Sequence, residues 1–280
     1  MGKTKIIADS TCDLTKEILE KFDITLTPLT ITVGGKDYHD GIDIDNAKLF
    51  EYAEKGVKCA TSAVNIYEYE NIFEEMLKKY DSVIHINISN EFSSCYQNAC
   101  IAAKKFEGVY VIDSRNLSSG SGHIVYDAAV MAQQNADAKD IYEKMLLTVP
   151  KVEASFVIDD IDYLYKGGRC SGVEAFGANL LKIKPSIEVI DGKMEVGKKY
   201  RGTFEQCLEK YAADRLKGRT DIDCSRVFIT HSMCKPETVR LVRDTLAQFA
   251  GFNEIIETTA GCTISTHCGP NTLGIMFKRI

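Results

Sequence analysis

Strand-like and helix-like stretches alternate along the first half of this 280-residue chain, and the alternation restricts the folds open to it. Runs rich in β-branched residues cover 5–8, 83–88 and 109–113, while runs with apolar side chains at helical spacing cover 66–79 and 95–106. Strands joined by helices pair in parallel, because the helical crossover returns the chain to the same end of the sheet. The first half therefore predicts an α/β fold with a mostly parallel sheet and helices on both faces.

Further elements of the first half are predicted from capping residues and periodicity. They are a helix over 14–22 that starts at Asp13, an extended segment over 24–33, a helix over 45–55 capped by Asp43 or Asp45, and a helix over 124–134 after a turn rich in Ser and Gly. Thr27-Pro28 excludes a helix from the extended segment, and Gly34-Gly35 predicts a turn at its end.

The second half changes character at a hairpin signal. Asp191-Gly192 separates extended runs at 182–189 and 193–196, and an Asp-Gly pair suits a type I′ turn. Other expected features are strands at 154–158, 225–230, 252–258 and 273–277, helices at 203–216 and 237–249, and a polar, Gly-rich stretch at 163–172. This mixture predicts a second α/β domain with an antiparallel or mixed sheet. We expect a boundary near 148–153, which divides the chain into domains 1–150 and 151–280.

Charge and hydropathy exclude two classes of partner. The net charge is −6 and Lys or Arg never occur more than two in a row, so the basic face that nucleic-acid binding needs is not indicated. The apolar runs are far shorter than the ~18 residues that span a bilayer, which leaves only transient membrane contact open. No signal-peptide stretch begins the sequence, so we expect a cytoplasmic protein.

The 10 cysteines are scattered without any Cys-x-x-Cys pair, and this argues against a metal site. The nearest His/Cys pairs are His231 with Cys234 and His267 with Cys268, and neither has a second pair at zinc-finger spacing. Reduced thiols that fill small apolar spaces are the simpler interpretation. We therefore expect no metal and no cofactor.

Two hydroxyl clusters, Thr61-Ser62 and Ser93-Ser94, each lie where a strand-like run gives way to a helical one. At the carboxyl end of a parallel sheet such side chains face the crevice in which α/β sheets bind ligands. A helix N-terminus there also favours an anionic group. A purely structural role as helix caps is the alternative. Because Asn65 with Glu68, and Ser94 with Gln97, already fit capping boxes, Thr61, Ser62 and Ser93 remain free for a ligand.

Catalytic motifs are scarce. The sequence contains no Walker phosphate loop and no Gly-x-Ser-x-Gly nucleophile elbow. Asp159-Asp160-x-Asp162 offers oxygen ligands for Mg²⁺ and Lys166-Gly-Gly-Arg169 offers a phosphate cradle, although a helix cap and a turn are the simpler explanation of the two segments. An alternative function is therefore a Mg²⁺-dependent phosphotransferase or phosphatase that uses Asp9, Asp159 and Lys166.

A series of short motifs resembles the DegV family of fatty-acid-binding proteins over the whole chain. In order they are Asp9-Ser-Thr11, Asp13-Leu14, Thr61-Ser62, Ile88-Ser89, Phe92-Ser93, Tyr96-Gln97, Ile112-Asp-Ser114, Tyr163-Leu-Tyr-Lys-Gly-Gly-Arg169, Leu180-Leu-Lys-Ile-Lys-Pro185, Asp191-Gly192, Arg201-Gly202 and Thr266-His-Cys-Gly-Pro270. The sequence departs from the family at Ala63-Val64, where Gln-Pro is usual, and at Asn90-Glu91, which places a carboxylate near the pocket mouth.

The resemblance implies a two-domain DegV-like fold with a lipid tunnel between or beside the domains. It implies that Thr61 and Ser93 hold the carboxylate of a long-chain fatty acid, and that Ser62, Ser94, Arg169 and His267 surround this head group. It also implies a carrier without catalytic residues of its own, which presents the fatty acid to an ATP-dependent fatty acid kinase for acyl-phosphate formation. Chain length, unsaturation preference, the kinase's identity and the oligomeric state depend on tertiary packing and stay open.

Overall fold

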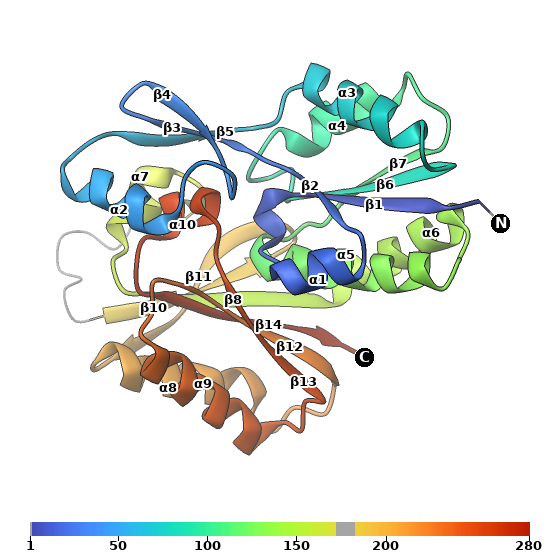
Figure 1. Cartoon of the computed structure of the whole chain (residues 1–280). Helices are drawn as coiled ribbons and strands as arrows, with labels where there is room; N and C mark the ends of the chain where they lie inside the picture. The colour runs from blue at the N-terminus through green and yellow to red at the C-terminus, as the bar shows by residue number, and fades with distance from the viewer. Residues whose placement is uncertain (1, 172–182) are drawn as a thin grey trace.

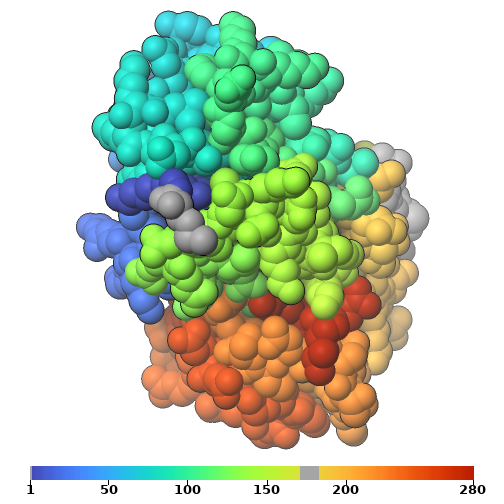
Figure 2. Space-filling model, turned by 90° about the vertical axis from the view of Figure 1, so that its right-hand side faces the viewer, coloured from blue at the N-terminus to red at the C-terminus, as the bar shows by residue number. Residues whose placement is uncertain are grey.

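The computed structural model describes residues 2–171 and 183–280, which form three sheets. A four-stranded sheet has the order β2-β1-β6-β7, a seven-stranded sheet the order β13-β12-β14-β8-β10-β11-β9, and a small sheet the order β4-β3-β5. The four-stranded sheet lies above the seven-stranded sheet in Figure 1, and the small sheet lies to one side. The side view of Figure 2 shows the same stacking, with the cyan and green residues at the top and the orange residues at the bottom.

All pairings of the four-stranded sheet are parallel, which confirms the prediction for the first half. Its strands are β1 (Thr4–Asp9), β2 (Thr25–Thr27), β6 (Ser82–Asn87) and β7 (Val109–Asp113). Helices α3 (Ile66–Leu77) and α4 (Cys95–Ala103) cover one face, and α1 (Lys16–Lys21), α5 (Ser118–Gln133) and α6 (Ala138–Thr148) cover the other. Both faces of these strands are therefore covered by helices, which suits their β-branched runs.

The small sheet is antiparallel, and it places Thr61 differently from the expectation. It consists of β3 (Thr30–Val33), β4 (Lys36–His39) and β5 (Cys59–Ser62), and helix α2 (Asn46–Glu54) packs against it. Thr61 pairs with Ile31 across β3, so the expectation that both hydroxyl clusters end parallel strands is wrong for Thr61. The turn at Gly34 and Gly35, with φ angles of 58° and 87°, folds β4 back along one edge of β3, and β5 pairs with the other edge of β3.

The seven-stranded sheet is mixed, as predicted for the second half. Its strands are β8 (Val152–Ile158), β9 (Cys170–Ser171), β10 (Ile183–Ile190), β11 (Lys193–Arg201), β12 (Ile222–Ser232), β13 (Glu254–Thr259) and β14 (Thr272–Arg279). Helices α8 (Phe204–Leu216) and α9 (Pro236–Phe249) cover its outer face. Asp191 and Gly192 have φ angles of 49° and 82°, which confirms the predicted turn. The expected strand start at Lys182, the end of the Gly-rich stretch at residue 172 and the motif residues 180–182 lie outside the described residues.

Helix α5 packs between the two large sheets, and its Ser/Gly-rich start is helical rather than a turn. The helix begins at Ser118, ahead of the predicted 124, because its glycines allow close packing. A Cβ atom on Gly122 would lie 2.7 Å from the carbonyl oxygen of Cys12. His123 contacts the carbonyl of Met276 through Nε2 at 3.0 Å, so this helix joins both sheets. The division into two domains near residue 150 stays a prediction.

Two further local predictions are wrong, and one helix was not predicted. The helix expected at 14–22 begins only at Lys16, with Thr15 as its cap, because Asp13 adopts a left-handed conformation after the short helix η1 (Ser10–Cys12). Residues 163–167 of the expected Gly-rich stretch belong to helix α7 (Asp162–Gly167), and the segment around His267, for which no element was expected, forms helix α10 (Cys262–Cys268). Within the described part of the chain, the helices are too short or too polar to cross a bilayer.

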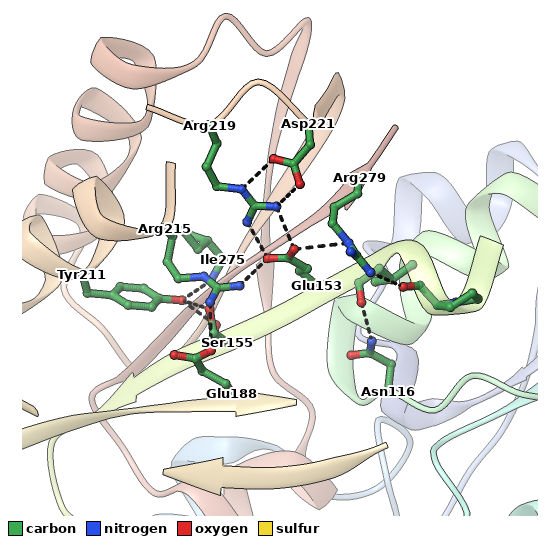
Figure 3. A network of polar contacts seen from close by, with 12 residues as sticks. Asn116, Glu153, Ser155, Glu188, Tyr211, Arg215, Arg219, Asp221, Ile275 and Arg279 are labelled. Carbon is green, nitrogen blue, oxygen red and sulfur yellow. Dashed lines mark hydrogen bonds and ion pairs between the residues drawn. The ribbon is translucent and has the colours of Figure 1, made fainter. Parts of the chain in front are cut away.

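A network centred on Glu153 fixes α8 on the seven-stranded sheet (Figure 3). The carboxylate of Glu153, on β8, receives Arg215 at 2.6 Å, Arg219 at 2.7 Å and Arg279 at 3.4 Å. Arg215 also contacts Glu188 on β10 at 3.0 Å. Three segments that are distant in sequence thus meet at one half-buried carboxylate, a fourth is linked through Arg215, and three guanidinium groups depend on the charge of Glu153.

Glu153→Gln therefore destabilises the fold by ~2–4 kcal/mol, since it removes the shared partner of three partly desolvated cations. Glu143→Gln is the matched control, because Glu143 pairs with Lys139 at 3.8 Å and both side chains are more than 60% exposed (69% and 61%). Its expected cost is below ~0.5 kcal/mol. Urea unfolding of both variants checks the comparison, and equal small losses would contradict the central role of Glu153.

Candidate functional site

One cavity of about 720 Å³ brings together all six side chains that the sequence singled out around a head group. They are Thr61 and Ser62 from β5, Ser93 and Ser94 from the start of α4, Arg169 from the segment after α7, and His267 from α10. Much of the remaining lining is apolar and includes Leu29, Ile88, Leu117, Met194 and Ile264. The cavity thus combines polar groups from four segments with an apolar interior.

His267 and Thr61 form the direct contact that joins the two halves of the chain in this cavity. Nε2 of His267 lies 2.8 Å from Oγ1 of Thr61. Burial, and then the charge of Arg169, lower the pKa of His267 to about 4, so the imidazole is neutral at pH 7. When Nε2–H donates to Thr61, the hydroxyl proton of Thr61 remains for an acceptor in the cavity.

The N-terminus of α10 is held by two buried carboxyl groups. The backbone N–H of Gly261 donates to Asp13 and that of Cys262 donates to Asp40, both at 2.8 Å. Burial raises the pKa of Asp13 to about 8, although hydrogen bonds from Ser118 and Gly261 lower it. Asp13 was expected to start the helix at 14–22. Instead it accepts a hydrogen bond at the start of α10, which is distant in sequence. No local signal in the sequence identifies Asp13 or Asp40 as an acceptor for this helix end.

Ser93 and Ser94 exchange the roles that the capping pattern predicts. Ser94 makes no capping bond with its side chain, whereas the N–H of Cys95 donates to Ser93 Oγ at 3.3 Å. The reason is that Ser94 already has near-helical backbone angles of −75° and 1°. The Ser93 hydroxyl donates to Cys95 Sγ at 3.1 Å, and burial raises the pKa of that thiol to about 12. Sulfur is a weak acceptor, so the Ser93 proton stays available to a better one.

The segment that carries Thr61 is anchored to α3 and α4. Asn65 and Glu68 form the predicted capping box of α3, with bonds of 2.9 and 3.0 Å. The amide of Asn98, on α4, donates to the carbonyl of Val64 at 2.8 Å. The sequence interpretation missed Asn98, because a polar residue within a helix gives no sign of a distant backbone partner. This bond fixes Thr61 relative to Ser93.

Arg169 lies at the exposed edge of the cavity, directly after α7. Its Nη1 donates to the carbonyl of Gly167 at 2.6 Å. Gly167 also faces the histidine, because a Cβ atom there would lie 2.6 Å from Nδ1 of His267. The predicted turn therefore begins only at Gly168, which ends α7 with a φ of 63°. Glu91 lines the cavity as expected, and Lys193 lies 3.7 Å from its carboxylate.

The alternative catalytic residues have separate surroundings. Asp9, the last residue of β1, is buried and accepts from Tyr69 Oη and from the N–H of Ile88, each at 2.9 Å. Asp159 pairs with Lys184 at 2.5 Å, and Lys166 lines a second cavity that contains neither carboxylate. Across residues 2–171 and 183–280, no three His, Cys, Asp or Glu side chains are grouped to hold a metal ion.

The fold and the cavity together define an α/β protein with a pocket that is polar at one end and apolar within. A family model described as "Uncharacterised protein, DegV family" matches residues 3–279. The chain belongs to the DegV family, as the sequence motifs indicated.

Similar proteins cover nearly the full chain. A DegV domain-containing protein of Caldanaerobacter subterraneus subsp. tengcongensis is 33% identical over 282 residues, with 99% of each chain covered. A structure of fatty acid binding by a DegV family protein from Thermus thermophilus has a TM-score of 0.88 at 25% identity, covering 99% of this chain and 100% of the other. The structure of DegV, a fatty acid binding protein from Bacillus subtilis, has a TM-score of 0.82 at 25% identity and covers 100% of both chains.

Gly167→Ala tests the packing around the histidine. The added methyl group would meet Nδ1 of His267, so we expect a loss of ~1–3 kcal/mol in the free energy of unfolding, as in other overpacked sites. Gly251→Ala is the control, because a Cβ atom there meets nothing within 4 Å. A crystal structure of Gly167→Ala should show the imidazole displaced from Thr61. If the imidazole of His267 does not move and the stability is unchanged, the packing between residue 167 and His267 is not tight.

The lowered pKa of His267 predicts a pH-dependent stability. Between the ordinary value of 6.5 and the folded value of about 4, the unfolded chain binds more protons than the native state. The neutral His267 therefore makes its full contribution to the free energy of unfolding above pH 6.5. This contribution is lost as the pH falls towards 4, by up to ~3 kcal/mol. His267→Gln should flatten the pH dependence over this window in urea unfolding. Parallel curves for both proteins would contradict the assignment.

Proposed function

We propose that this protein binds one long-chain fatty acid, with the carboxylate at Thr61 and Ser93 and the acyl chain in the apolar part of the 720 Å³ cavity. The observation that carries the proposal is the neutral His267 bonded to Thr61 at the polar end of an otherwise apolar pocket. The fatty-acid binding named for the Thermus thermophilus and Bacillus subtilis structures supports it. On this proposal the tunnel lies between the predicted domains 1–150 and 151–280.

The energetics of such a ligand suit the two parts of the cavity. A chain of ~14 methylenes gains up to ~11 kcal/mol on leaving water, at ~0.8 kcal/mol each and before the costs of association. A carboxylate buried without partners would cost several kcal/mol, so the polar end must supply donors. The hydroxyl of Ser93 gives up only a weak bond to sulfur, and that of Thr61 is oriented by His267. Arg169 adds a positive charge at the same end.

We further propose that the loaded protein presents its fatty acid to a kinase, which supplies ATP and the catalytic residues. Ser62, Ser94 and Arg169 are exposed and line the cavity, so the head group is reachable from outside. We place this carrier in the cytoplasm. All 10 cysteines fall within the described residues and are free thiols, which suits a reducing compartment.

Thr61→Ala and Ser93→Ala should each weaken fatty-acid binding by ~1.5–3 kcal/mol, the range for hydrogen bonds to a charged group. Thr220→Ala, at an exposed position away from the cavity, is the control and should bind as the wild type does. Denaturing the freshly purified protein should release about one fatty acid per wild-type chain, and less from the two variants. Mass spectrometry measures the amount released. Full lipid content in both variants would overturn the head-group assignment.

The kinase step is tested separately. Loaded protein with a cognate kinase and Mg-ATP should form acyl phosphate, whereas the protein alone should hydrolyse neither nucleotides nor phosphate esters. Turnover by the protein alone that is lost in Asp9→Asn or Asp159→Asn would instead favour the Mg²⁺-dependent phosphotransferase.

A further inference from the structure

Helix α10, which lies beside the small sheet in Figure 1, carries three hydroxyl side chains, and one of them is buried without a partner. Ser265 contacts Ser232 at 3.0 Å, and Thr266 donates to the carbonyl of Cys262 at 2.7 Å. The hydroxyl of Thr263 has no hydrogen-bond partner in the described part of the chain, although the residue is only 4% exposed. Buried hydroxyl groups are nearly always hydrogen-bonded, so this exception calls for an explanation.

The position of Thr263 near the start of the helix deprives its hydroxyl of the usual acceptors. A threonine inside a helix bonds the carbonyl three or four residues before it. The carbonyl three residues earlier, that of Ala260, already accepts from Asn46 Nδ2 at 2.7 Å and from Ser265 Oγ at 3.3 Å. Since a carbonyl oxygen has two lone pairs, its capacity is used. The residue four positions earlier, Thr259, belongs to strand β13 and not to the helix.

Thr263 lines the 720 Å³ cavity together with His267. The two residues are four positions apart in α10, so they lie on one side of the helix, about 6 Å apart along its axis. Because His267 contacts Thr61 at the head-group end, a group one helical turn away lies near that end of the cavity. The lining next to it is apolar and includes Ile264 of the same helix.

The side chain of Thr263 is free to turn its hydroxyl towards the cavity. Threonine in a helix populates two χ1 rotamers, and a rotation about the Cα–Cβ bond exchanges the hydroxyl with the methyl group. No hydrogen bond holds the hydroxyl where it lies, so this rotation breaks none. A polar group in the cavity therefore gains a partner at Thr263 without competing with the protein for it.

We propose that Thr263 selects a fatty acid whose acyl chain carries a hydroxyl group near its carboxyl end. The inference rests on the proposed function, because the carboxylate at Thr61 and Ser93 determines which part of the chain passes Thr263. An unsubstituted chain excludes water and leaves the Thr263 hydroxyl unpaired, which costs free energy. A hydroxyl group on the chain also lacks a partner in an apolar cavity, so the two groups satisfy each other.

The test offers the protein equimolar mixtures of palmitate and one monohydroxypalmitate, across a series of hydroxyl positions. Mass spectrometry of the lipids released from the washed, denatured protein measures the bound ratio. We expect the wild type to take up an isomer with its hydroxyl near the carboxyl end at least as well as palmitate. Thr263→Val nearly keeps the shape of the side chain and removes its hydroxyl, so it should lower this ratio roughly tenfold, as for the loss of one hydrogen bond.

Thr266→Val is the matched control, because its hydroxyl is bonded to Cys262 and the residue lines the neighbouring cavity that also contains Lys166. It should leave the bound ratio unchanged. A general loss of stability lowers the uptake of both lipids together, so the ratio reports recognition alone. Exclusion of every hydroxylated isomer by the wild type overturns the inference, and so does an equal ratio in wild type and Thr263→Val. A wild type that takes up neither lipid overturns the proposed function instead.

Discussion

The amide groups at the start of α10 donate to Asp13 and Asp40, and the geometry of the candidate site follows from these two hydrogen bonds. A helix terminus leaves backbone groups without partners, so buried acceptors there determine where the helix can lie. Here they tie the last part of the chain to loops of the first half. His267, at the other end of the same short helix, is thereby brought to Thr61.

His267 lies between two cavities, and several contacts fix the position and the protonation state of its side chain. Its Nε2 contacts Thr61, its Nδ1 is closely covered by Gly167, and burial keeps the ring neutral. A neutral imidazole orients a hydroxyl without drawing a carboxylate into a salt bridge. Arg169 supplies the charge from the exposed side of the cavity. The site thus uses a buried neutral group, His267, to orient the Thr61 hydroxyl, and an exposed group, Arg169, to carry the positive charge, because an unpaired charge is costly to bury.

Local signals predicted the elements whose stability is local. The alternation of strands and helices in the first half, the capping box of Asn65 and the Asp191-Gly192 turn depend on residues a few positions apart, and the structure confirms them. Helix α10 was missed because its sequence, Cys-Thr-Ile-Ser-Thr-His-Cys, is polar and β-branched, and because its stabilising carboxyls lie in the distant first half. The Ser93–Ser94 exchange was missed for a similar reason, since a one-residue shift of a helix start leaves the capping pattern almost unchanged.

The amino-acid sequence by itself determined the alternation of strands and helices, the mixed second sheet, the family and the six side chains that meet in the first cavity. These follow from periodicity and short motifs, which act over neighbouring positions. Only the tertiary structure decided that Thr61 comes from an antiparallel strand, that Asp13 and Asp40 hold α10, and that Lys58 and Lys166 face a second cavity. Such features depend on contacts between segments that are distant in sequence and on the exclusion of water when these segments pack. Local sequence patterns predict neither the contacts nor the burial.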